Sequence, residues 1–595
     1  MENDISYYIS PNGDDKNPAT KEKPVKTLSK ALELSRQKNE ERTIIVREGF
    51  YENVSVLLDE RDCGLTLKAE GKAVLCGGSR IFNWTPVETG SPKTNSSKDN
   101  LSYDGTYRAK LPCDFPDDLR MITINGQFRE RARYPQTGYL KHKSVFNSIW
   151  LSTSAGGWDI KPTAQQLTTL DFDPADIKAD FDWQNAELTI FHKWDETLTS
   201  LSAYDFSNNK FKLSLSMTHP PGAFESQYYI VWNTIEGMTK GKWRIDKKER
   251  YIYYKPLDGE NIFDIEVIAP VHQNIIKIKD GISRFCIDGL EFTSTHTPMV
   301  ACGFGSLHLP GAIDAEIKTS ISDCLFKNLY FTNLSGWGIK LTADKEAKGR
   351  NVTIENCQVN DSGGGGIRIN GINNCIIKGN NISNIGKIYF SAIAIYTDRA
   401  DTCVIIENEL LNLPYTGICA GWKCDNILIK RNKVKNAVYI LNDGGGIYVT
   451  GNKDGLITSN IVSDIFQKQD NPDISQRNGI YLDEQISGYI VENNLVYECP
   501  SALLNHMSKG NIIRNNAYVS TNGSVMLSFI RCQEYIIEKN AVQAAEEVTF
   551  AHRQDAFAKF DANLLYSSLN RIESVYVNDD YKRSEPVKLN PIQAN

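Results

Sequence analysis

An asparagine returns nine times in the same local frame, apolar-x-x-Asn-x-apolar, along the second half of the chain. The spacings between successive members are 28, 24, 28, 24, 28, 34, 22 and 24 residues. The members are Asn328, Asn356, Asn380, Asn408, Asn432, Asn460, Asn494, Asn516 and Asn540, and Asn356 matches the frame least well. A period held this closely means that one supersecondary unit repeats and stacks on its neighbours.

The repeating unit is built from strands. Each period holds two or three short β-branched runs separated by Asn, Gly and Asp, without a long helical periodicity. Leucines do not recur at fixed offsets, and propeller blades need periods of about 40 residues. We therefore predict an all-β fold, a right-handed parallel β-helix with three strands per coil. The asparagine should sit at a tight turn, tolerate left-handed backbone and bond to the asparagine of the next rung. An Asn-rich loop series in an ordinary sandwich would not hold such a period.

Patterning divides the chain into four regions. Residues 1–70 contain an N-terminal cap and the first coils, with an amphipathic helix expected at 27–36 and a strand at 42–50. Residues 71–260 lack the asparagine period and carry many Trp and Tyr residues, which predicts an inserted antiparallel, sandwich-like β-domain. Residues 261–548 form the parallel β-helix with the site, and residues 549–595 form a polar C-terminal tail.

Charge and composition restrict the partners. The net charge of -7 offers no basic stripe for phosphates, so nucleic acid is not an expected partner. No apolar run is long enough for a transmembrane helix, so no membrane partner is expected. The thirteen cysteines show no zinc spacing and are expected to be free, and no cofactor is expected. The first residues, MENDIS, do not resemble a secretory signal, so the protein is either cytoplasmic or a signal has been removed. The sequence leaves the oligomeric state open.

A second motif, Gly-Ile-x-apolar-x, follows the asparagine in each coil. Strand alternation places its third and fifth residues outside, so the stacked coils should present two outward columns. The first column is Lys340, Arg368, Tyr396, Cys419, Tyr448, Tyr481, Leu504 and Leu527, and the second is Thr342, Asn370, Asp398, Gly421, Thr450, Asp483, His506 and Phe529. Tyrosines, carboxylates, a histidine and the neighbouring Trp422 suit the apolar faces and hydroxyls of sugars, which predicts a carbohydrate groove. A tyrosine ladder that only stabilises the sheet is the alternative.

Two acidic segments hold the candidate catalytic groups. Asp443 precedes three glycines, and Asp483 with Glu484 ends the corresponding strand of the next coil. Glycoside hydrolysis needs two carboxylates that flank one bond, although Asp443 also fits an ordinary Asp-Gly turn. Along a straight strand Asp443 would lie about 23 Å from Asp483, so only a bend or bulge at the glycines returns it to the groove. Without that bend Asp483 must pair with Glu484 or with Asp398, which suits a substrate ligand better.

The longest period inserts residues 466–477 just before the Asp483 strand. Insertions in solenoids emerge on one face, often the binding face. This loop is a candidate wall of the groove, and a tolerated surface insertion is the alternative.

Several segments resemble known carbohydrate-active proteins. Residues 8–13 (YISPNG) with Pro24 and residues 27–28 resemble the N-terminal cap of bacterial polysaccharide-active β-helix proteins. Residues 124–126 (ING) and 131–135 (RARYP), together with 443–448 (DGGGIY) and 479–483 (GIYLD), resemble glycoside hydrolase family 141, and family 120 β-xylosidases are similar. The resemblance implies exo-acting or debranching hydrolysis of plant-type glycans, with α-L-fucosidase and xylanase activities among the members. It also implies Asp443 and Asp483 as the catalytic pair and secretion to the periplasm.

Together these observations predict a glycoside hydrolase with a carbohydrate substrate and no metal. Asp443, Asp483 and Glu484 are the catalytic candidates, and Tyr448 and His506 are expected to orient Asp483 or a sugar hydroxyl. The remaining substrate-binding candidates are Arg368, Tyr396, Asp398, Trp422 and Tyr481. One alternative is a polysaccharide lyase that uses Lys340 or Arg368 as its base. The other is a non-catalytic glycan-binding solenoid.

Overall fold

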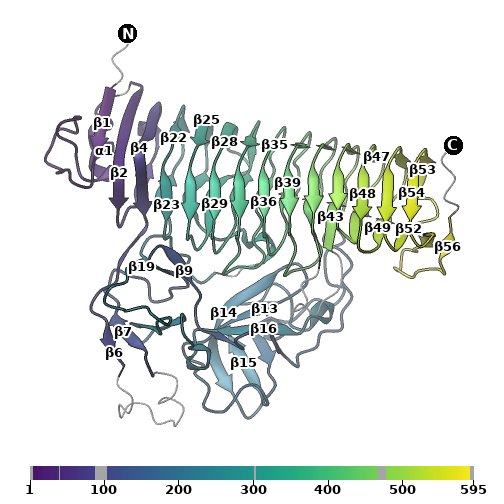
Figure 1. Cartoon of the computed structure of the whole chain (residues 1–595), viewed down its shortest axis with the longest axis horizontal. Coiled ribbons are helices and arrows are strands. Elements are labelled where there is room, and N and C mark those ends of the chain that lie inside the picture. The colour runs from purple at the N-terminus through teal and green to yellow at the C-terminus, as the bar shows by residue number, and fades with distance from the viewer. Residues whose placement is uncertain (1–4, 39, 88–103, 301–302, 467–476, 590–595) are drawn as a thin grey trace.

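The computed structural model describes residues 5–38, 40–87, 104–300, 303–466 and 477–589. It contains the predicted right-handed parallel β-helix, and antiparallel sheets lie along one side of it (Figure 1). The long axis runs from the N-terminal strands to the C-terminal strands, so the coils stack in chain order. The predicted fold class is therefore confirmed.

The first elements close the N-terminal end of the solenoid. They are β1 (Ile5–Ile9), α1 (Leu28–Ser35), β2 (Arg42–Tyr51) and β4 (Leu65–Cys76), and the strands pair in parallel. Helix α1 begins after Thr27, whose side chain accepts a hydrogen bond from the backbone amide of Lys30. It buries Leu28, Ala31 and Leu32 against the strands, so an apolar end of the solenoid is covered.

The strands of two of the three solenoid faces belong to one hydrogen-bonded parallel sheet. The first face continues from β4 through β22 (Cys286–Asp288), β25 (Ser320–Lys327), β28 (Lys348–Glu355), β32 (Ile376–Lys378), β35 (Val404–Ile406), β38 (Leu428–Lys430), β41 (Leu456–Thr458), β44 (Ile490–Glu492), β47 (Ile512–Arg514), β50 (Tyr535–Glu538) and β53 (Phe557–Asp561). The second face contains β23 (Glu291–Thr293), β26 (Tyr330–Thr332), β29 (Gln358–Asn360), β33 (Asn381–Ser383), β36 (Glu409–Leu411), β39 (Lys433–Lys435), β42 (Ile461–Ser463), β45 (Leu495–Tyr497), β48 (Ala517–Ser520), β51 (Ala541–Ala544) and β54 (Leu564–Ser567).

The third face carries both predicted columns. Its strands are β3 (Val56–Leu58), β20 (Ile276–Ile278), β24 (Gly311–Ile317), β27 (Trp337–Ala343), β30 (Ile367–Asn370), β34 (Ile395–Asp398), β37 (Ile418–Ala420), β40 (Gly444–Val449), β43 (Arg477–Leu482), β46 (Ser501–His506), β49 (Val525–Ile530), β52 (Glu547–His552) and β55 (Arg571–Tyr576). A short antiparallel strand, β56 (Val587–Lys588), ends this sheet. The solenoid therefore continues beyond residue 548, where its end was expected.

The asparagine ladder is buried and continuous. Asn408 donates from Nδ2 to Oδ1 of Asn432 at 2.9 Å and to the carbonyl oxygen of Ile377 at 3.0 Å. The same Oδ1 of Asn432 accepts the backbone amide of Asn408 at 3.0 Å. This pattern repeats through Asn380, Asn408, Asn432, Asn460, Asn494, Asn516, Asn540 and Asn563. Each amide therefore satisfies polar groups that would otherwise be buried without partners.

Two of the nine predicted members do not belong to the ladder. Asn328 and Asn356 are exposed and adopt left-handed φ angles of 56° and 54°. The register places Cys357 at the ladder position, where its amide bonds to Oδ1 of Asn380. In later coils the left-handed residue is likewise the one before the ladder asparagine, for example Glu407 at 59°. The expectation that the ladder asparagine itself takes the left-handed conformation was wrong, and Asn563 is a member that the sequence frame missed.

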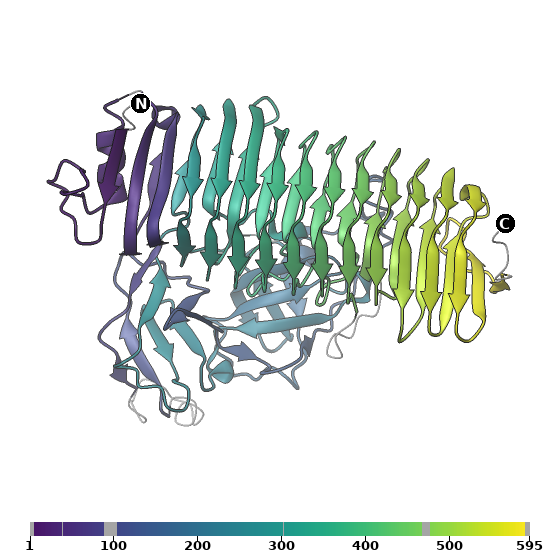
Figure 2. The same cartoon turned by 45° about the horizontal axis from the view of Figure 1, so that its top comes forward.

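The insertion leaves the solenoid after β4 and returns at β20. Its largest sheet is antiparallel and contains β10 (Arg133–Tyr134), β11 (Leu140–Lys141), β12 (Thr169–Asp171), β13 (Glu187–Phe191), β14 (Glu196–Asp205), β15 (Lys210–Leu213) and β16 (Tyr228–Trp232), with α3 (Ala164–Thr168) nearby in sequence. Two smaller sheets contain β6 (Thr85–Pro86), β7 (Tyr107–Lys110), β17 (Trp243–Asp246) and β18 (Tyr251–Tyr254), and β5 (Gly78–Arg80), β8 (Ile122–Ile124), β9 (Gln127–Arg129) and β19 (Val267–Pro270). Figure 2 shows the insertion lying alongside the coils.

Buried charges join the insertion to the segment that precedes β24. Glu187 is fully buried and pairs with Arg120 at 3.0 Å, Arg131 at 2.8 Å and Lys247 at 2.9 Å. Arg120 also donates to the carbonyl oxygen of Thr297 at 2.8 Å. Removing one partner would leave an uncompensated buried charge, which is strongly destabilising. This network therefore holds the two parts in one arrangement.

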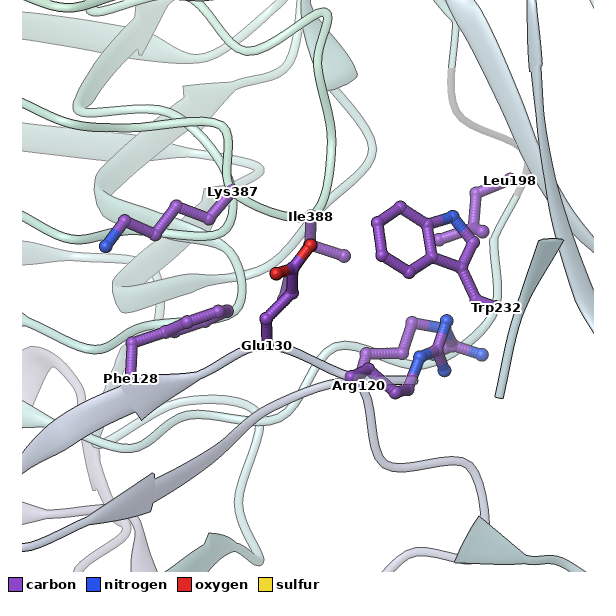
Figure 3. A pocket seen from close by; sticks show the side chains of 8 residues that line it. Arg120, Phe128, Glu130, Leu198, Trp232, Lys387 and Ile388 are labelled. Atoms are coloured by element: carbon purple, nitrogen blue, oxygen red, sulfur yellow. The ribbon is translucent and has the colours of Figure 1, made fainter. Parts of the chain in front are cut away.

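A small cavity lies beside this network (Figure 3). Its volume is about 20 Å³, enough for one water molecule but not for a sugar ring. Its lining residues are Arg120, Phe128, Glu130, Arg131, Leu198, Trp232, Lys387 and Ile388. It is therefore part of the junction between insertion and solenoid.

In the described part of the chain no helix is long and apolar enough to cross a membrane.

The ladder predicts a specific pattern of stability effects. Replacing Asn460 by alanine removes its bond to Asn494 and leaves the amide and carboxamide of Asn432 without their acceptor. We expect the free energy of unfolding to fall by about 1–3 kcal/mol, measured by urea denaturation followed by circular dichroism. Asn356→Gly is the matched control, because glycine tolerates the left-handed φ there, and it should change stability by less than about 0.5 kcal/mol. Equal effects of the two changes would contradict a structural ladder.

Candidate active site

Asp443 lies at the turn that enters β40. Its φ angle is 54°, and its backbone carbonyl accepts the Tyr415 hydroxyl at 3.0 Å. A side chain at Gly444 would place Cβ 2.6 Å from the Tyr415 ring, so the following residue must be glycine. The adjacent strand β43 pairs with β40 in continuous register, with Tyr448 opposite Tyr481. The pairing shows no register shift at the glycines, but a Cβ at Gly445 would lie 3.0 Å from the carbonyl oxygen of Ile447, so the backbone bends there, which is the condition for Asp443 to reach the groove.

Two tyrosine side chains link the carboxylates of Asp443 and Asp483. Tyr481 donates from its hydroxyl to Oδ1 of Asp443 at 3.2 Å. Burial raises the pKa of Tyr481 well above its ordinary value, and the nearby charges of Asp443 and Asp483 add to the rise. Tyr448 donates to Oδ2 of Asp483 at 2.7 Å. The two rings lie 4.9 Å apart, centroid to centroid. Asp443 and Asp483 thus belong to one cluster, because each accepts a hydrogen bond from one of two tyrosines whose rings are in contact.

Asp483 is held on its other oxygen by a histidine. Nδ1 of His506 lies 2.8 Å from Oδ1 of Asp483, and Nε2 of His506 lies 2.9 Å from the hydroxyl of Tyr581. The Tyr581 ring lies 4.5 Å below the guanidinium of Arg531, whose Nε donates to the carbonyl oxygen of Asp579. The C-terminal segment therefore contributes a residue to the site, although the sequence indicated only a polar tail.

Asp443 has a different electrostatic environment. Burial raises the pKa of its carboxyl above the ordinary value, Lys193 opposes the rise, and the nearby charge of Asp483 adds to it. Nζ of Lys193 lies 3.7 Å from Oδ2 of Asp443, and the side chain of Asp443 remains 20% exposed. Lys193 belongs to the hairpin between β13 and β14, so the insertion supplies part of the site. No sequence signal distinguished Lys193 from other lysines.

Glu484 does not face the other two carboxylates as a free group. Its carboxylate accepts the backbone amides of Thr153 and Ser154 at 3.0 and 2.7 Å, and the residue is 5% exposed. These bonds fasten a loop of the insertion to the solenoid beside Asp483. The third catalytic candidate is thus placed as an anchor in this structure.

The other predicted binding residues lie further along the third face. Tyr396 is three coils before Tyr481, is 5% exposed, and packs against Phe304. The Arg368 guanidinium lies 5.9 Å from the Tyr396 ring centroid and bonds to the carbonyl oxygen of Leu307. Asp398 accepts a hydrogen bond from Asn370 at 2.7 Å. These residues do not join the carboxylate cluster.

Trp422 lies beside the outward columns, and the columns end at a register shift between β46 and β49. Trp422 is half-buried, and a Cβ at Gly451 would lie 2.0 Å from its ring. A register shift between Ser501 and Leu503 pairs Leu504 with Ser528 and His506 with Ile530. The assignment of Leu527 and Phe529 to the outward columns was therefore wrong, because counting along a regular strand cannot anticipate the shift.

The surroundings of the site bear on three predictions: the loop wall, the metal and the lyase base. Of the loop 466–477, residues 467–476 lie outside the described residues. Among the residues that the structure describes, no three His, Cys, Asp or Glu side chains come together to hold a metal ion. Lys340, a candidate lyase base, lies 3.8 Å from Asp314 on the neighbouring strand.

Comparisons with known proteins agree with this fold. The family model for the right-handed β-helix region matches residues 316–468, and no curated protein matches the chain. A glycoside hydrolase structure superimposes with a TM-score of 0.67 at 18% identity, over 86% of this chain and 96% of that one. The complex of XylC with xylose gives 0.54 at 15% identity, over 94% and 87%. The Streptococcus pneumoniae adhesin PfbA gives only 0.38 at 13%, over 52% and 86%. The chain is thus a parallel β-helix whose similar structures include glycoside hydrolases.

Proposed function

We propose that this protein is a glycoside hydrolase and that Asp443 and Asp483 cleave the glycosidic bond of a complex carbohydrate. The observation that carries the proposal is a pair of neighbouring tyrosines, Tyr481 and Tyr448, which donate hydrogen bonds to Asp443 and Asp483 respectively. Two carboxyl groups at one partly exposed position are what acid-assisted glycoside cleavage requires. The resemblance of the surrounding segments to family 141 also suggests exo-acting or debranching hydrolysis and a periplasmic or secreted location.

The environments assign different roles to the two groups. Asp443 acts as the general acid, because its raised pKa favours a protonated carboxyl that can protonate the leaving oxygen. Asp483 acts as the nucleophile or base, because Tyr448 donates a hydrogen bond to one of its oxygens and His506 lies beside the other. Hydrogen bonds to the ionised form stabilise a carboxylate. Tyr448, Tyr481 and His506 thus act by positioning the reacting groups.

The spacing also bears on stereochemistry. The hydroxyls of Tyr481 and Tyr448, whose rings lie 4.9 Å apart, each donate to one of the two carboxylates and so gather them in one small region. Retaining enzymes hold their carboxyl groups about 5–5.5 Å apart, whereas inverting enzymes need about 6.5–9.5 Å to admit a water molecule. For this compact cluster we propose the shorter separation and a retaining mechanism with a covalent intermediate on Asp483.

Substitution of each carboxylate tests the assignment. We expect Asp443→Asn and Asp483→Asn each to lower kcat/KM on unactivated oligosaccharides by about 10²–10⁴-fold, measured over a panel of plant oligosaccharides and aryl glycosides. Asp443→Asn should retain more activity on dinitrophenyl glycosides, because that leaving group needs no proton. Asp398→Asn is the matched control and should leave dinitrophenyl glycoside turnover nearly unchanged.

Undiminished turnover in both Asp443 and Asp483 variants would refute the pair, and glycan binding without turnover in the wild type would favour a binding module.

Lys193 predicts a change in pH dependence. The lysine lowers the pKa of Asp443, so Lys193→Met should raise that pKa further. Because the acid must be protonated, activity is lost as pH rises through its pKa, and the alkaline limb of kcat/KM should move to higher pH. Lys435→Met, on the exposed second face, is the control and should leave the limb in place. A shift to lower pH would contradict the assigned role.

Tyr581 is predicted to act through His506. Removing its hydroxyl in Tyr581→Phe should lower kcat by roughly 10-fold, as losses of outer-shell partners do. The double variant with His506→Ala should cost no more than His506→Ala alone, since both act through one chain of contacts. Tyr566→Phe, at an exposed position, serves as the control. Additive losses would show that Tyr581 acts independently.

A further inference from the structure

The tyrosines of the third face do not offer stacking surfaces for a sugar ring. Tyr448 and Tyr481 are 8% and 3% exposed, and their hydroxyls are engaged by the carboxylates. Aromatic rings that bind sugars must present an open face to the apolar side of the ring. A stacking surface must therefore come from another part of the molecule.

The insertion carries a cluster of aromatic rings that we name the aromatic wall: Trp150, Trp158, Trp194, His219 and Phe224. The Trp150 ring lies 4.9 Å from Trp158 and 5.4 Å from Trp194, centroid to centroid. Phe224 lies 4.8 Å from Trp158 and 4.7 Å from Trp194. His219 contacts the other four rings at 5.1–5.9 Å.

The rings of the aromatic wall differ in solvent exposure, and some are buried while others are only half-buried. Trp158 and His219 are 7% and 8% exposed, whereas Trp150, Trp194 and Phe224 are only half-buried. Burial lowers the pKa of His219 to about 4, so its ring is uncharged near neutral pH. The wall thus presents an apolar, uncharged surface.

Two contacts tie this wall to the carboxylates. Trp194 directly follows Lys193, which lies 3.7 Å from Asp443. On the other side, the loop that follows Trp150 is held through Thr153 and Ser154 by Glu484, the neighbour of Asp483. The wall is therefore fastened beside both members of the proposed catalytic pair.

Phe224 shows that the front of the wall is built under strain. Its φ angle is 57° and that of Glu225 is 62°, a conformation that bulky residues rarely adopt. Gly222, two residues earlier, has φ of 81°, and a Cβ there would lie 2.2 Å from the carbonyl oxygen of Ser144. Strained backbone that the surroundings enforce is concentrated at ligand-binding positions.

We propose that Trp150, Trp194 and Phe224 form a subsite that stacks on the apolar face of a neutral sugar ring adjacent to the bond that Asp443 and Asp483 cleave. The subsite rests on the proposed function for its position in the reaction, but sugar binding can be measured without turnover. A neutral ring is specified because the five rings of the wall carry no charge and the neighbouring Lys193 is paired with Asp443 at 3.7 Å.

Binding by the inactive variant Asp483→Asn tests the subsite. The probe is an array of neutral and uronate-containing oligosaccharides, followed by calorimetric titration with the neutral member that binds best. We expect neutral members to bind, and Trp194→Ala and Trp150→Ala in the same background to weaken binding by about 10-fold or more. Trp194→Phe keeps a ring and should recover most of the affinity with an unchanged Tm, which separates stacking from misfolding. Ile149→Ala, at a neighbouring residue that is 68% exposed, is the matched control.

The outcomes separate this subsite from the catalytic proposal. If the tryptophan variants lose binding while the wild type hydrolyses nothing, the subsite stands and the hydrolase proposal fails. If the wild type hydrolyses a glycan and the tryptophan variants bind and turn it over normally, the subsite is refuted alone. Binding restricted to uronate-containing members, or to none, also overturns it.

Discussion

The parallel register of the coils depends on the buried asparagine ladder, which ties each rung to the next through two side-chain bonds and one backbone bond. Asn432, for example, accepts from Asn408 and donates to Asn460 without contact with water. A slip of one residue would turn the inward residues outward and break these bonds together. Because the register is fixed in this way, Tyr448 stands opposite Tyr481, and the site on the third face follows from it.

The site itself is assembled from three distant parts of the chain. The solenoid contributes Asp443 and Asp483, the insertion contributes Lys193, and the C-terminal segment contributes Tyr581. The rungs alone cannot enclose a bond, since a flat sheet face is open to solvent. The insertion, fastened by Glu484 and by the buried charges around Glu187, places polar and aromatic groups over that face.

Much of the fold could be predicted from the sequence, because a repeat period and strand alternation are local properties. Helix α1, the parallel solenoid and the position of Asp483 follow from them. The ladder members Asn328 and Asn356 were misassigned because asparagine also suits the left-handed residue one position earlier. The approach of Asp443 could not be derived, because it depends on a backbone bend at the glycines that leaves the strand register unchanged and that the sequence does not show. Lys193 and Tyr581 come from segments without a repeat to align them.

Tyr481 and Tyr448 hold Asp443 and Asp483 in one cluster, which we propose is compact enough for double displacement at the anomeric carbon. The most direct measurement is the anomeric configuration of the first sugar released from a glycoside substrate, followed by proton NMR before mutarotation. We expect net retention of configuration. Net inversion would contradict it, because inversion requires room for a water molecule between the sugar and Asp483.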